Sequence, residues 1–370
     1  MRKRVVMGAL LATAVVLALG AGAASKATAA AKLTKVTLQL KWVPQAQFAG
    51  YYAAQDLGFY KQAGLDVTLK NGGPNIIPEQ VVASGQAQFG VDWLPSLLSA
   101  RDQGTQLVNV AQVFKRSGMT QLTWKSSGIT SVAKMRGKKV ANWLGGNQYE
   151  LFAALTKAGM DPAKNQGVTI VQQPFDMNLF LNHQVDSASA MTYNELAQVL
   201  ESKNPKTGKL YTLKDLNVIK MQDAGTGMLE DGLFSTADWL KSAANRKTAI
   251  AFIGASLAGW IWCRDHVAQC VQFTLKAGPT LPKGHQTWMM NEINKLIWPA
   301  SGGGIGIMNA AAYNRTAKIS QQFGVIKKKP SGAYRTDLAK AAVAQLKKNG
   351  LDVKGVHYKP EMVHLTAGGK

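Results

Sequence analysis

The chain has 370 residues, 46% of them hydrophobic, with 43 basic and 21 acidic side chains and a formal net charge of +22. This composition is typical of a globular protein and excludes a largely disordered one. The positive charge points first to nucleic acid, but the basic residues form no recognised nucleic-acid-binding module, so we expect no nucleic acid partner. We expect solvated basic faces, with attraction to an acidic membrane or transporter surface as the alternative.

Residues 1–29 have the features of a secretion signal. Three basic residues at positions 2–4 precede an apolar run over 5–19, and small residues with A-x-A spacing follow up to residue 29. We therefore expect a cleaved signal and a periplasmic protein. The alternative, an uncleaved anchor, is less favoured because the run is shorter than the ~20 residues that span a bilayer. No cysteine precedes Cys263, which argues against a lipid-anchored lipoprotein.

The remainder, about 340 residues, is longer than a single core usually grows and predicts two lobes. Its first strand pattern covers 36–42, where apolar and polar side chains alternate until Pro44 prevents continuation. A helix from Gln47 to a stop at Gly58 follows. Because ligands of open α/β sheets bind beyond the carboxyl ends of strands, we expect ligand-binding side chains here. They are Trp42, Gln45, Gln47 and, on the helix, Tyr52.

Strand patterns continue at 65–70, 88–93 and 107–114, with helices between them. The strand at 88–93 ends in Asp92 and Trp93, and Pro95 then opens a helix. This unit repeats the geometry of the first, so we expect Asp92 and Trp93 to face the same crevice as Trp42. The helix N-terminus also offers backbone N–H donors to a polar ligand group.

A second lobe is predicted from residue 126, with strands at 138–143, 168–173 and 187–192, and the chain is expected to cross back to the first lobe after 216–222. Gly145 and Gly146 follow the first of these and open a helix, where backbone amides can form a nest for an oxygen or anion. A tight turn without a ligand is an equally favoured interpretation, and for Asn147 at the helix start a capping role is favoured. The candidate ligand-binding residues of this lobe are Trp143, Asn147, Tyr193 and Glu195.

Several segments resemble the periplasmic solute-binding components of ABC importers. They are WVPQAQFAGYYAA, QVVASGQAQFGVDWLPSLL, GGNQYELFAALTKAGMDP, MTYNEL, GMLEDGLF and LIWPASGGGIG, which are spread over most of the chain after residue 33. The branch that they resemble captures thiamine-pyrimidine precursors and riboflavin, and the sulfonate, nitrate and taurine binders are more distant relatives. The resemblance implies that Glu195 in MTYNEL accepts hydrogen bonds from a heterocycle and that Glu230 in GMLEDGLF joins the ligand site.

The resemblance also implies an α/β, two-lobed periplasmic-binding-protein type II architecture, with the ligand cleft between the lobes and two hinge crossings. We expect the first lobe to comprise residues 33–125 and 224–370, including the C-terminal helices, and the second to comprise 126–223. Hinge motion is expected near 115–127 and 222–228. The implied function is to capture a small nitrogen heterocycle by lobe closure and deliver it to a membrane permease, as a monomer without a cofactor.

Aromatic side chains at the carboxyl ends of strands can stack on a flat ring, which is worth about 0.5 to 1.5 kcal/mol per pair beyond burial. We expect at least two of the four candidate aromatic residues to contact the ligand, with core packing as the alternative for each. The four are Trp42, Trp93, Trp143 and Tyr193. The carboxylates of Asp92 and Glu195 would repel a small anion and suit ring N–H donors. The expected ligand is a thiamine-pathway pyrimidine first and riboflavin second, with a sulfonate, nitrate or taurine receptor as the alternative.

An enzymatic function would need a constellation of reactive residues. The five histidines of the sequence fall in different predicted elements, neither GxSxG nor HExxH occurs, and no His or Cys ligands have metal-site spacing. Fungal relatives of the resembled family are enzymes that build the thiamine pyrimidine, with a histidine in the first motif and a cysteine-rich segment. Here Gln47 and Phe48 stand where the histidine is expected. We therefore expect no catalytic residues, no metal and no enzyme, with a pyrimidine-synthase-like enzyme as the least favoured alternative.

The sequence contains two cysteines, Cys263 and Cys270. Seven residues along an unbroken helix rise about 10.5 Å, which is beyond the Cα separation that a disulfide allows. A break at Asp265 and His266 between two helices would bring the sulfurs together, and an exported compartment would let them pair. We expect a structural disulfide, with two free thiols as the alternative.

Overall fold

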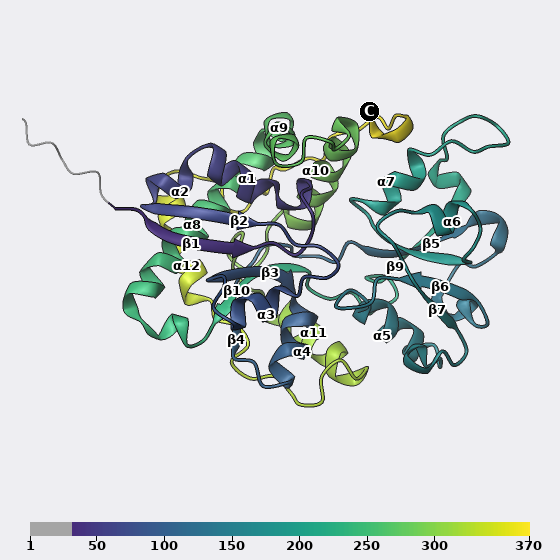
Figure 1. Cartoon of the computed structure of the whole chain (residues 1–370), viewed down its shortest axis with the longest axis horizontal. Coiled ribbons are helices and arrows are strands. Elements are labelled where there is room, and N and C mark those ends of the chain that lie inside the picture. Colours follow the sequence, from purple (N-terminus) through teal and green to yellow (C-terminus); the bar gives the residue numbers. More distant parts are fainter. Residues whose placement is uncertain (1–31) are drawn as a thin grey trace, which may run out of the picture. The chain divides into compact units, whose positions relative to one another are not determined.

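The computed structural model describes residues 32–370, so the predicted secretion signal lies outside the described residues. Two five-stranded sheets organise this part of the chain (Figure 1). Each sheet, together with the helices that pack on it, is called a lobe below. Among the described residues, no helix is both long enough and apolar enough to cross a membrane.

The sheet of the first lobe has the strand order β2-β1-β3-β10-β4. β1 is parallel to β2 and β3, whereas β10 runs antiparallel to β3 and β4. The strands are β1 (Thr34–Gln39), β2 (Leu65–Lys70), β3 (Phe89–Trp93), β4 (Leu107–Gln112) and β10 (Asp231–Thr236). The helices of this lobe are α1 (Ala49–Asp56), α2 (Phe59–Gln62), α3 (Pro78–Ala83), α4 (Leu94–Asp102), α8 (Ala243–Asp265), α9 (Val267–Ala277), α10 (Lys283–Ile297), α11 (Ala310–Gln322) and α12 (Asp337–Lys348).

The sheet of the second lobe has the order β7-β6-β8-β5-β9. β6 is parallel to β7 and β8, and β5 is antiparallel to β8 and β9. The strands are β5 (Met119–Trp124), β6 (Lys139–Asn142), β7 (Thr169–Gln172), β8 (Ser187–Met191) and β9 (Leu216–Lys220). The helices are α5 (Tyr149–Lys157), α6 (Asn178–Leu181) and α7 (Glu195–Leu200).

β1 ends at Gln39, earlier than the expected end at Trp42. The paired strand β2 ends opposite it at Lys70, so the parallel ladder has no partner beyond that point. Two further backbone bonds form, from the N–H of Leu40 to the carbonyl of Lys70 and from the N–H of Gly72 to the carbonyl of Trp42 (both 2.9 Å). Lys41 and Trp42 therefore lie in the loop after β1 rather than in the strand.

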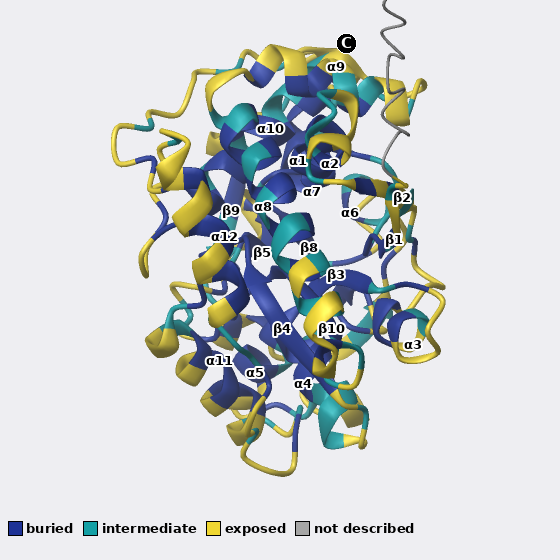
Figure 2. Cartoon of the chain, turned by 90° about the vertical axis from the view of Figure 1, so that its left-hand side faces the viewer, coloured by how far each residue is buried: buried dark blue, intermediate teal, exposed yellow. Residues whose placement is uncertain are grey.

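An aromatic stack ties the first sheet to its helices. Phe252 of α8 stacks on Phe89 of β3, with ring centroids 4.4 Å apart, and on Tyr60 of α2, with centroids 5.5 Å apart. Helices α1 and α8 approach closely at Gly259. A Cβ added there would lie 2.0 Å from the carbonyl oxygen of Gly50, so this approach requires glycine. Figure 2 shows that the central strands are buried and that exposed residues lie on outer turns and helix faces.

The chain passes between the lobes twice, over residues 113–118 between β4 and β5 and over 221–230 between β9 and β10. From the sequence we expected the first lobe to continue to residue 125, which would place the segment of β5 in the first lobe. In the structure β5 hydrogen-bonds to β8 and β9, so it belongs to the second sheet. The cause is its antiparallel pairing with β8, which the strand pattern alone does not specify. The other domain boundaries stay predictions.

Two buried carboxyl groups hold the crossing segments. Glu230 accepts hydrogen bonds from the backbone N–H groups of Gly118 (2.7 Å) and Met119 (3.2 Å). Glu150 of α5 accepts a hydrogen bond from the backbone N–H of Met228 (2.9 Å). Burial raises the pKa of Glu150 to about 8 and that of Glu230 well above its usual range. The Glu150 carboxyl therefore carries a proton in the folded protein at neutral pH.

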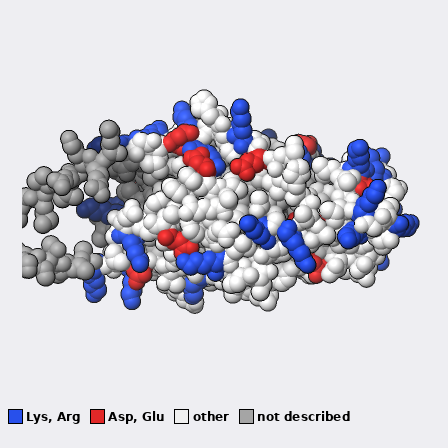
Figure 3. All heavy atoms as spheres, turned by 90° about the horizontal axis from the view of Figure 1, so that it is seen from above, with Lys and Arg blue, Asp and Glu red and all other residues white. Residues whose placement is uncertain are grey.

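Basic side chains lie on both halves of the face drawn in Figure 3, with acidic side chains between them. This face therefore presents charges of both signs rather than a continuous basic surface.

The two cysteines lie on either side of a break between helices. α8 ends at Asp265 and α9 begins at Val267, with His266 between them at φ −135° and ψ 56°, outside helical geometry. The break brings the Cα atoms of Cys263 and Cys270 to 5.4 Å, and the sulfurs form a disulfide. The bridge fastens the corner between α8 and α9.

Replacing Cys263 and Cys270 by serine should lower the free energy of unfolding by about 2 kcal/mol, because the bridge restricts the unfolded chain. Urea titration followed by tryptophan fluorescence measures the change. The bridge itself is checked by alkylating denatured protein without reductant, which should add no mass. Two alkyl groups per chain would contradict the bridge.

The stability of the protein should fall as the pH rises from 5 to 7. The pKa of Glu150 is raised from 4.5 to about 8 by burial, so its contribution is fully present below about 4.5 and is lost as the pH rises through 8. Each such carboxyl changes the free energy of unfolding by at most about 1.4 kcal/mol per pH unit. Glu150→Gln should therefore show a shallower pH dependence in urea titrations, and a slope equal to that of the wild type would contradict the assignment.

Candidate functional site

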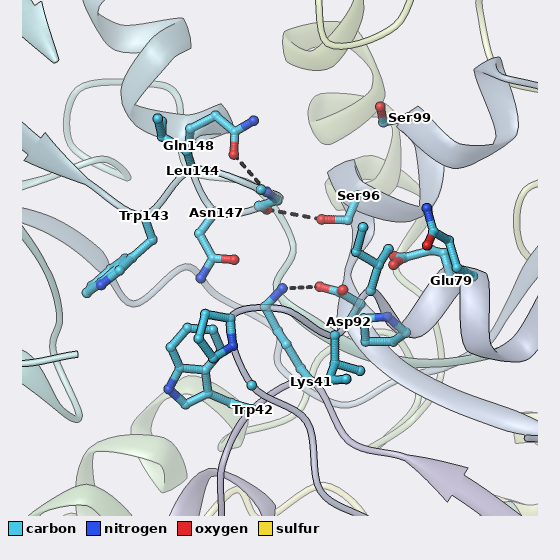
Figure 4. A pocket seen from close by; sticks show the side chains of 18 of the residues that line it. Lys41, Trp42, Glu79, Asp92, Ser96, Ser99, Trp143, Leu144, Asn147 and Gln148 are labelled. Carbon is cyan, nitrogen blue, oxygen red and sulfur yellow. Dashed lines mark hydrogen bonds and ion pairs between the residues drawn. The ribbon is translucent and has the colours of Figure 1, made fainter. Parts of the chain in front are cut away.

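A cavity of about 640 Å³ lies between the two lobes, at the carboxyl ends of the parallel strands. The first lobe contributes the loops after β1 and β2 and the start of α4, which follows β3 directly. The second lobe contributes the loops after β6 and β7. This is the position that the topology of open α/β sheets favours for ligands. Its lining includes Lys41, Trp42, Ile76, Ile77, Glu79, Asp92, Ser96, Ser99, Trp143, Leu144, Asn147, Gln148, Tyr149, Gln173 and Phe175 (Figure 4).

A small recess adjoins this cavity and shares four lining residues with it. Its volume of about 20 Å³ is room for about one water molecule. The recess is lined by Lys41, Trp42, Gln45, Gln47, Trp93, Trp143, Asn147, Met191, Tyr193, Asn194 and Glu195. It therefore gathers most of the residues expected at the crevice, but it does not hold a heterocycle in this arrangement of the lobes.

The residues expected to bind ligand fall into three groups. The cavity is lined by Trp42, Asp92, Trp143 and Asn147. The recess, but not the cavity, is lined by Gln45, Gln47, Trp93, Tyr193 and Glu195. Neither is lined by Tyr52 or Glu230: the Tyr52 side chain is buried in the core of the first lobe, and Glu230 is held at the crossings. For the first two groups a direct ligand contact stays a prediction.

Sequence reasoning missed several lining residues, among them Lys41, Glu79, Ser96 and Phe175. Glu79 lies in the first turn of α3, after the loop that follows β2, and Phe175 follows β7. Ligands of open α/β sheets bind beyond the carboxyl ends of the strands, and this holds for β2 and β7 as much as for the other strands. Applied to β2 and β7, the same reasoning would have predicted that the loops after them line the cavity. Ser96 in the first turn of α4 was within the expected helix start, but its side chain was not singled out.

A buried ion pair joins Lys41 to Asp92 on the wall of the cavity. Asp92 Oδ1 also accepts a hydrogen bond from the backbone N–H of Trp93 (2.6 Å), and the Lys41 ammonium lies 5.2 Å from the centre of the Trp93 ring. Burial alone would lower the pKa of Lys41, but the charge of Asp92 and the hydrogen bond to it outweigh burial and raise this pKa. Lys41 is therefore a cation whose charge is balanced inside the protein.

Glu79 lies beside Asp92 on the same wall (Figure 4). Its Oε1 is buried and has no hydrogen-bond partner among the described residues. Burial, followed by the charge of Asp92, raises the pKa of Glu79 well above its usual range. The surroundings of Glu79 therefore favour its protonated form, and the ammonium of Lys41 is paired with Asp92.

Glu195 occupies the first position of α7 and points into the recess. Its carboxylate accepts hydrogen bonds from the backbone N–H of Met191 (2.9 Å) and from Asn194 Nδ2 (2.7 Å). Burial raises the pKa of Glu195 to about 7. Since a carboxylate offers about four acceptor positions, these two bonds leave acceptor capacity for a ligand.

Side chains from both lobes meet around the recess in one hydrogen-bonded series. Gln47 Nε2 donates to Asp231 Oδ2 (2.9 Å), and Gln45 Nε2 donates to Gln47 Oε1 (2.6 Å). Asn194 Nδ2 of the second lobe then lies 3.5 Å from Gln45 Oε1. The series continues from Asn194 Oδ1 to His285 Nε2 (2.9 Å) and from His285 Nδ1 to Glu201 Oε2 (2.9 Å). It connects the loop after β1 and α10 of the first lobe to α7 of the second.

The cavity also has direct contacts between the lobes and an apolar portion. Ser96 Oγ donates to the carbonyl oxygen of Gly146 (3.0 Å), and the Trp42 and Phe175 rings meet edge to face with centroids 5.3 Å apart. Seven large hydrophobic side chains are exposed among the described residues, and four of them line this cavity. These four are Ile76, Ile77, Leu144 and Phe175, each 42–47% exposed. Their convergence indicates a surface that is covered when a ligand is bound.

The side chains that line the cavity offer several kinds of ligand contact. Among residues 32–370 there is no group of three or more His, Cys, Asp and Glu side chains that could hold a metal ion. The cavity offers indole faces, hydroxyl and amide groups from Ser96, Ser99, Asn147 and Gln148, and one balanced ion pair. These groups can orient a flat polar ligand by stacking and hydrogen bonding.

Comparison with curated proteins shows where this chain belongs. The family model described as NMT1/THI5 like matches residues 45–269. The riboflavin-binding protein RibY of Chloroflexus aurantiacus is 30% identical over 136 residues, which is 35% of this chain and 38% of that protein. A putative thiamine biosynthesis protein of Haemophilus influenzae is 21% identical over 299 residues, 80% of this chain and 88% of that protein. The Saccharomyces cerevisiae 4-amino-5-hydroxymethyl-2-methylpyrimidine phosphate synthase THI11 is 30% identical over 108 residues, 29% of this chain and 32% of that protein.

Comparison with solved structures gives the fold. The periplasmic sulfonate-binding protein SsuA of Methylobacillus flagellatus, described as part of a putative sulfonate ABC transporter, superposes with a TM-score of 0.60 at 15% identity. The match covers 90% of this chain and 99% of that structure. The chain therefore belongs to the NMT1/THI5-like family and has the two-lobed α/β fold of the periplasmic solute-binding proteins of ABC importers.

Proposed function

We propose that this protein is an extracytoplasmic receptor of an ABC importer that captures a flat, uncharged nitrogen heterocycle by closure of its two lobes. The observation that supports this most is the cavity between the lobes, which combines indole walls with a balanced ion pair. The proteins to which this chain is similar include a riboflavin-binding protein and a putative thiamine biosynthesis protein, which is consistent with a heterocyclic ligand. The receptor would act without a cofactor or catalysis and would hand its ligand to a membrane permease.

The walls of the cavity suit an aromatic ligand. Trp42 from the first lobe and Trp143 from the second both line it, so a flat ring that enters can contact an indole of each lobe. Aromatic pairs contribute about 0.5 to 1.5 kcal/mol each beyond the area they bury. A ligand held by both lobes would also favour the closed form, because a ligand shifts an equilibrium by its differential affinity for the two states.

The charges of the cavity disfavour an anionic ligand. Lys41 is the one lysine or arginine among its described lining residues, and Asp92 already neutralises it. A sulfonate or nitrate would need unbalanced positive charge and converging donors. We therefore favour a heterocycle over the sulfonate, nitrate and taurine alternatives.

The volume of about 640 Å³ is in the range of pockets that enclose drug-sized ligands. It accommodates a pyrimidine of the thiamine pathway and also a larger ring system such as that of riboflavin. The apolar side chains Ile76, Ile77, Leu144 and Phe175 extend the binding surface beyond what one small polar ring covers. Riboflavin-like ligands are therefore the better match to the cavity, ahead of the single pyrimidine ring that the motifs alone favoured.

Ligand binding should reduce the radius of gyration, because closure about residues 113–118 and 221–230 brings the lobes together. Small-angle X-ray scattering of the protein with and without saturating ligand measures the change, with calorimetry to confirm occupancy. An unchanged radius of gyration at full occupancy would refute lobe closure as the capture mechanism.

A thermal-shift screen should show stabilisation by riboflavin or an aminopyrimidine and none by taurine, alkanesulfonates or nitrate.

Trp42→Ala and Trp143→Ala should each weaken the binding of the heterocycle by about 1 kcal/mol or more, because each removes a ring contact. Trp262→Ala is the matched control, since this partly buried tryptophan of α8 does not line the cavity. Stabilisation only by sulfonates or nitrate would refute the heterocycle, and equal losses in all three variants would refute ring stacking.

A further inference from the structure

The wall of the cavity carries one lysine, Lys41, whose ammonium group is already paired with a carboxylate of the protein. The Lys41 and Asp92 side chains are 7% and 4% exposed, and the ammonium of Lys41 pairs with Asp92 Oδ1. The same oxygen accepts the backbone N–H of Trp93 (2.6 Å), immediately before α4 begins at Leu94. A lysine ammonium and backbone N–H groups at a helix start are donors that proteins use to bind anions. The carboxylate of Asp92 thus occupies the position that an anionic ligand would take.

We propose that Asp92 determines the ligand specificity of the cavity: its carboxylate satisfies Lys41 and the start of α4 from inside the protein, so the site rejects small anions and accepts uncharged ligands. The proposal rests on the cavity being the ligand site of the proposed function. It goes beyond that function because it assigns the discrimination against anions to one side chain and predicts how to reverse it.

Glu79 is the second carboxyl that acts on Lys41. It is 3% exposed, lies beside Asp92, and its Oε1 lacks a hydrogen-bond partner among the described residues (Figure 4). Burial and the neighbouring charge of Asp92 both raise the pKa of Glu79 and favour its protonated form. If Asp92 were neutralised, Glu79 could ionise and balance Lys41 in its place. A test must therefore neutralise both carboxyls.

The decisive variant is Asp92→Asn combined with Glu79→Gln. Both amides keep the shapes of the acids, and the Asn carbonyl can still accept from Lys41 and from the backbone N–H of Trp93. Calorimetric titration with butanesulfonate should give a Kd about ten- to a hundredfold lower than for the wild type, the range of one charge-assisted hydrogen bond. A Kd no lower than that of the wild type would overturn the proposal.

Three controls assign the gain to the cavity. Asp92→Glu keeps a carboxylate and should not gain sulfonate binding. Asp238→Asn combined with Glu361→Gln removes the same number of carboxyl groups at exposed positions, a change in net charge at least as large, and should not gain it either. Adding Lys41→Met to the decisive variant should abolish the gain. A gain that persists without Lys41, or that appears in the exposed-site control, would show that the sulfonate binds through general charge and would overturn the proposal.

Folding is monitored by thermal denaturation of each variant. If the double variant does not fold, Asp92→Asn alone is titrated at pH 5, because a lower pH favours the protonated form of Glu79, and the same gain is expected. A different result would show that the proposed function, rather than the role of Asp92, is wrong. In that case the wild type binds no heterocycle in the thermal-shift screen, whereas the butanesulfonate comparison between wild type and variant still reports on Asp92.

Discussion

The two crossings between the lobes are the constraint on which the site depends. Because the chain crosses at 113–118 and again at 221–230, the carboxyl ends of parallel strands from both sheets face the same space. Buried backbone N–H groups must find acceptors, and here Glu150 and Glu230 supply them from side chains rather than from a strand partner. The geometry of the hinge is therefore set by two protonatable carboxyl groups, which ties the arrangement of the lobes to local chemistry.

The charge of the whole chain is a poor guide to the charge of the cavity. The sequence carries +22, yet Lys41, the one lysine or arginine among the described residues that line the cavity, is paired with Asp92. Exposed charges act over a Debye length of about 8 Å at physiological salt, so surface lysines have little influence on a site between two lobes. A buried ion pair is weak evidence for stability, because desolvation offsets the attraction of its charges. Its clearer consequence here is selectivity.

The fold and the position of the cavity were predictable from sequence, whereas the contacts around the cavity were only partly so. Strand patterns followed by Pro44 and Pro95 placed Trp42 and Asp92 at carboxyl ends, and both line the cavity. The assignment of β5 could not be predicted, because it depends on which sheet a strand pairs with. Nor could the pairing of Lys41 with Asp92, since it joins side chains of two loops whose separation only the folded sheet determines. The break at His266 could be predicted, because two cysteines seven residues apart can form a disulfide only if the helix between them is interrupted.

The residues around the recess were expected from the sequence to contact the ligand, but in the structure they bond to one another and across the two lobes. Gln45, Gln47 and Glu195 were expected to contact ligand, yet the space that they line is about 20 Å³. With the lobes in this arrangement, Gln45 and Gln47 bond to each other, to Asp231 and, through Asn194, to the second lobe. A ligand could reach them only if those interlobe bonds were first broken. We therefore propose that the side chains around the recess favour closure, and that the cavity beside it, with two indoles and a paired lysine, provides the surface that a ligand contacts. On this proposal, affinity and closure depend on neighbouring but different residues of one cleft.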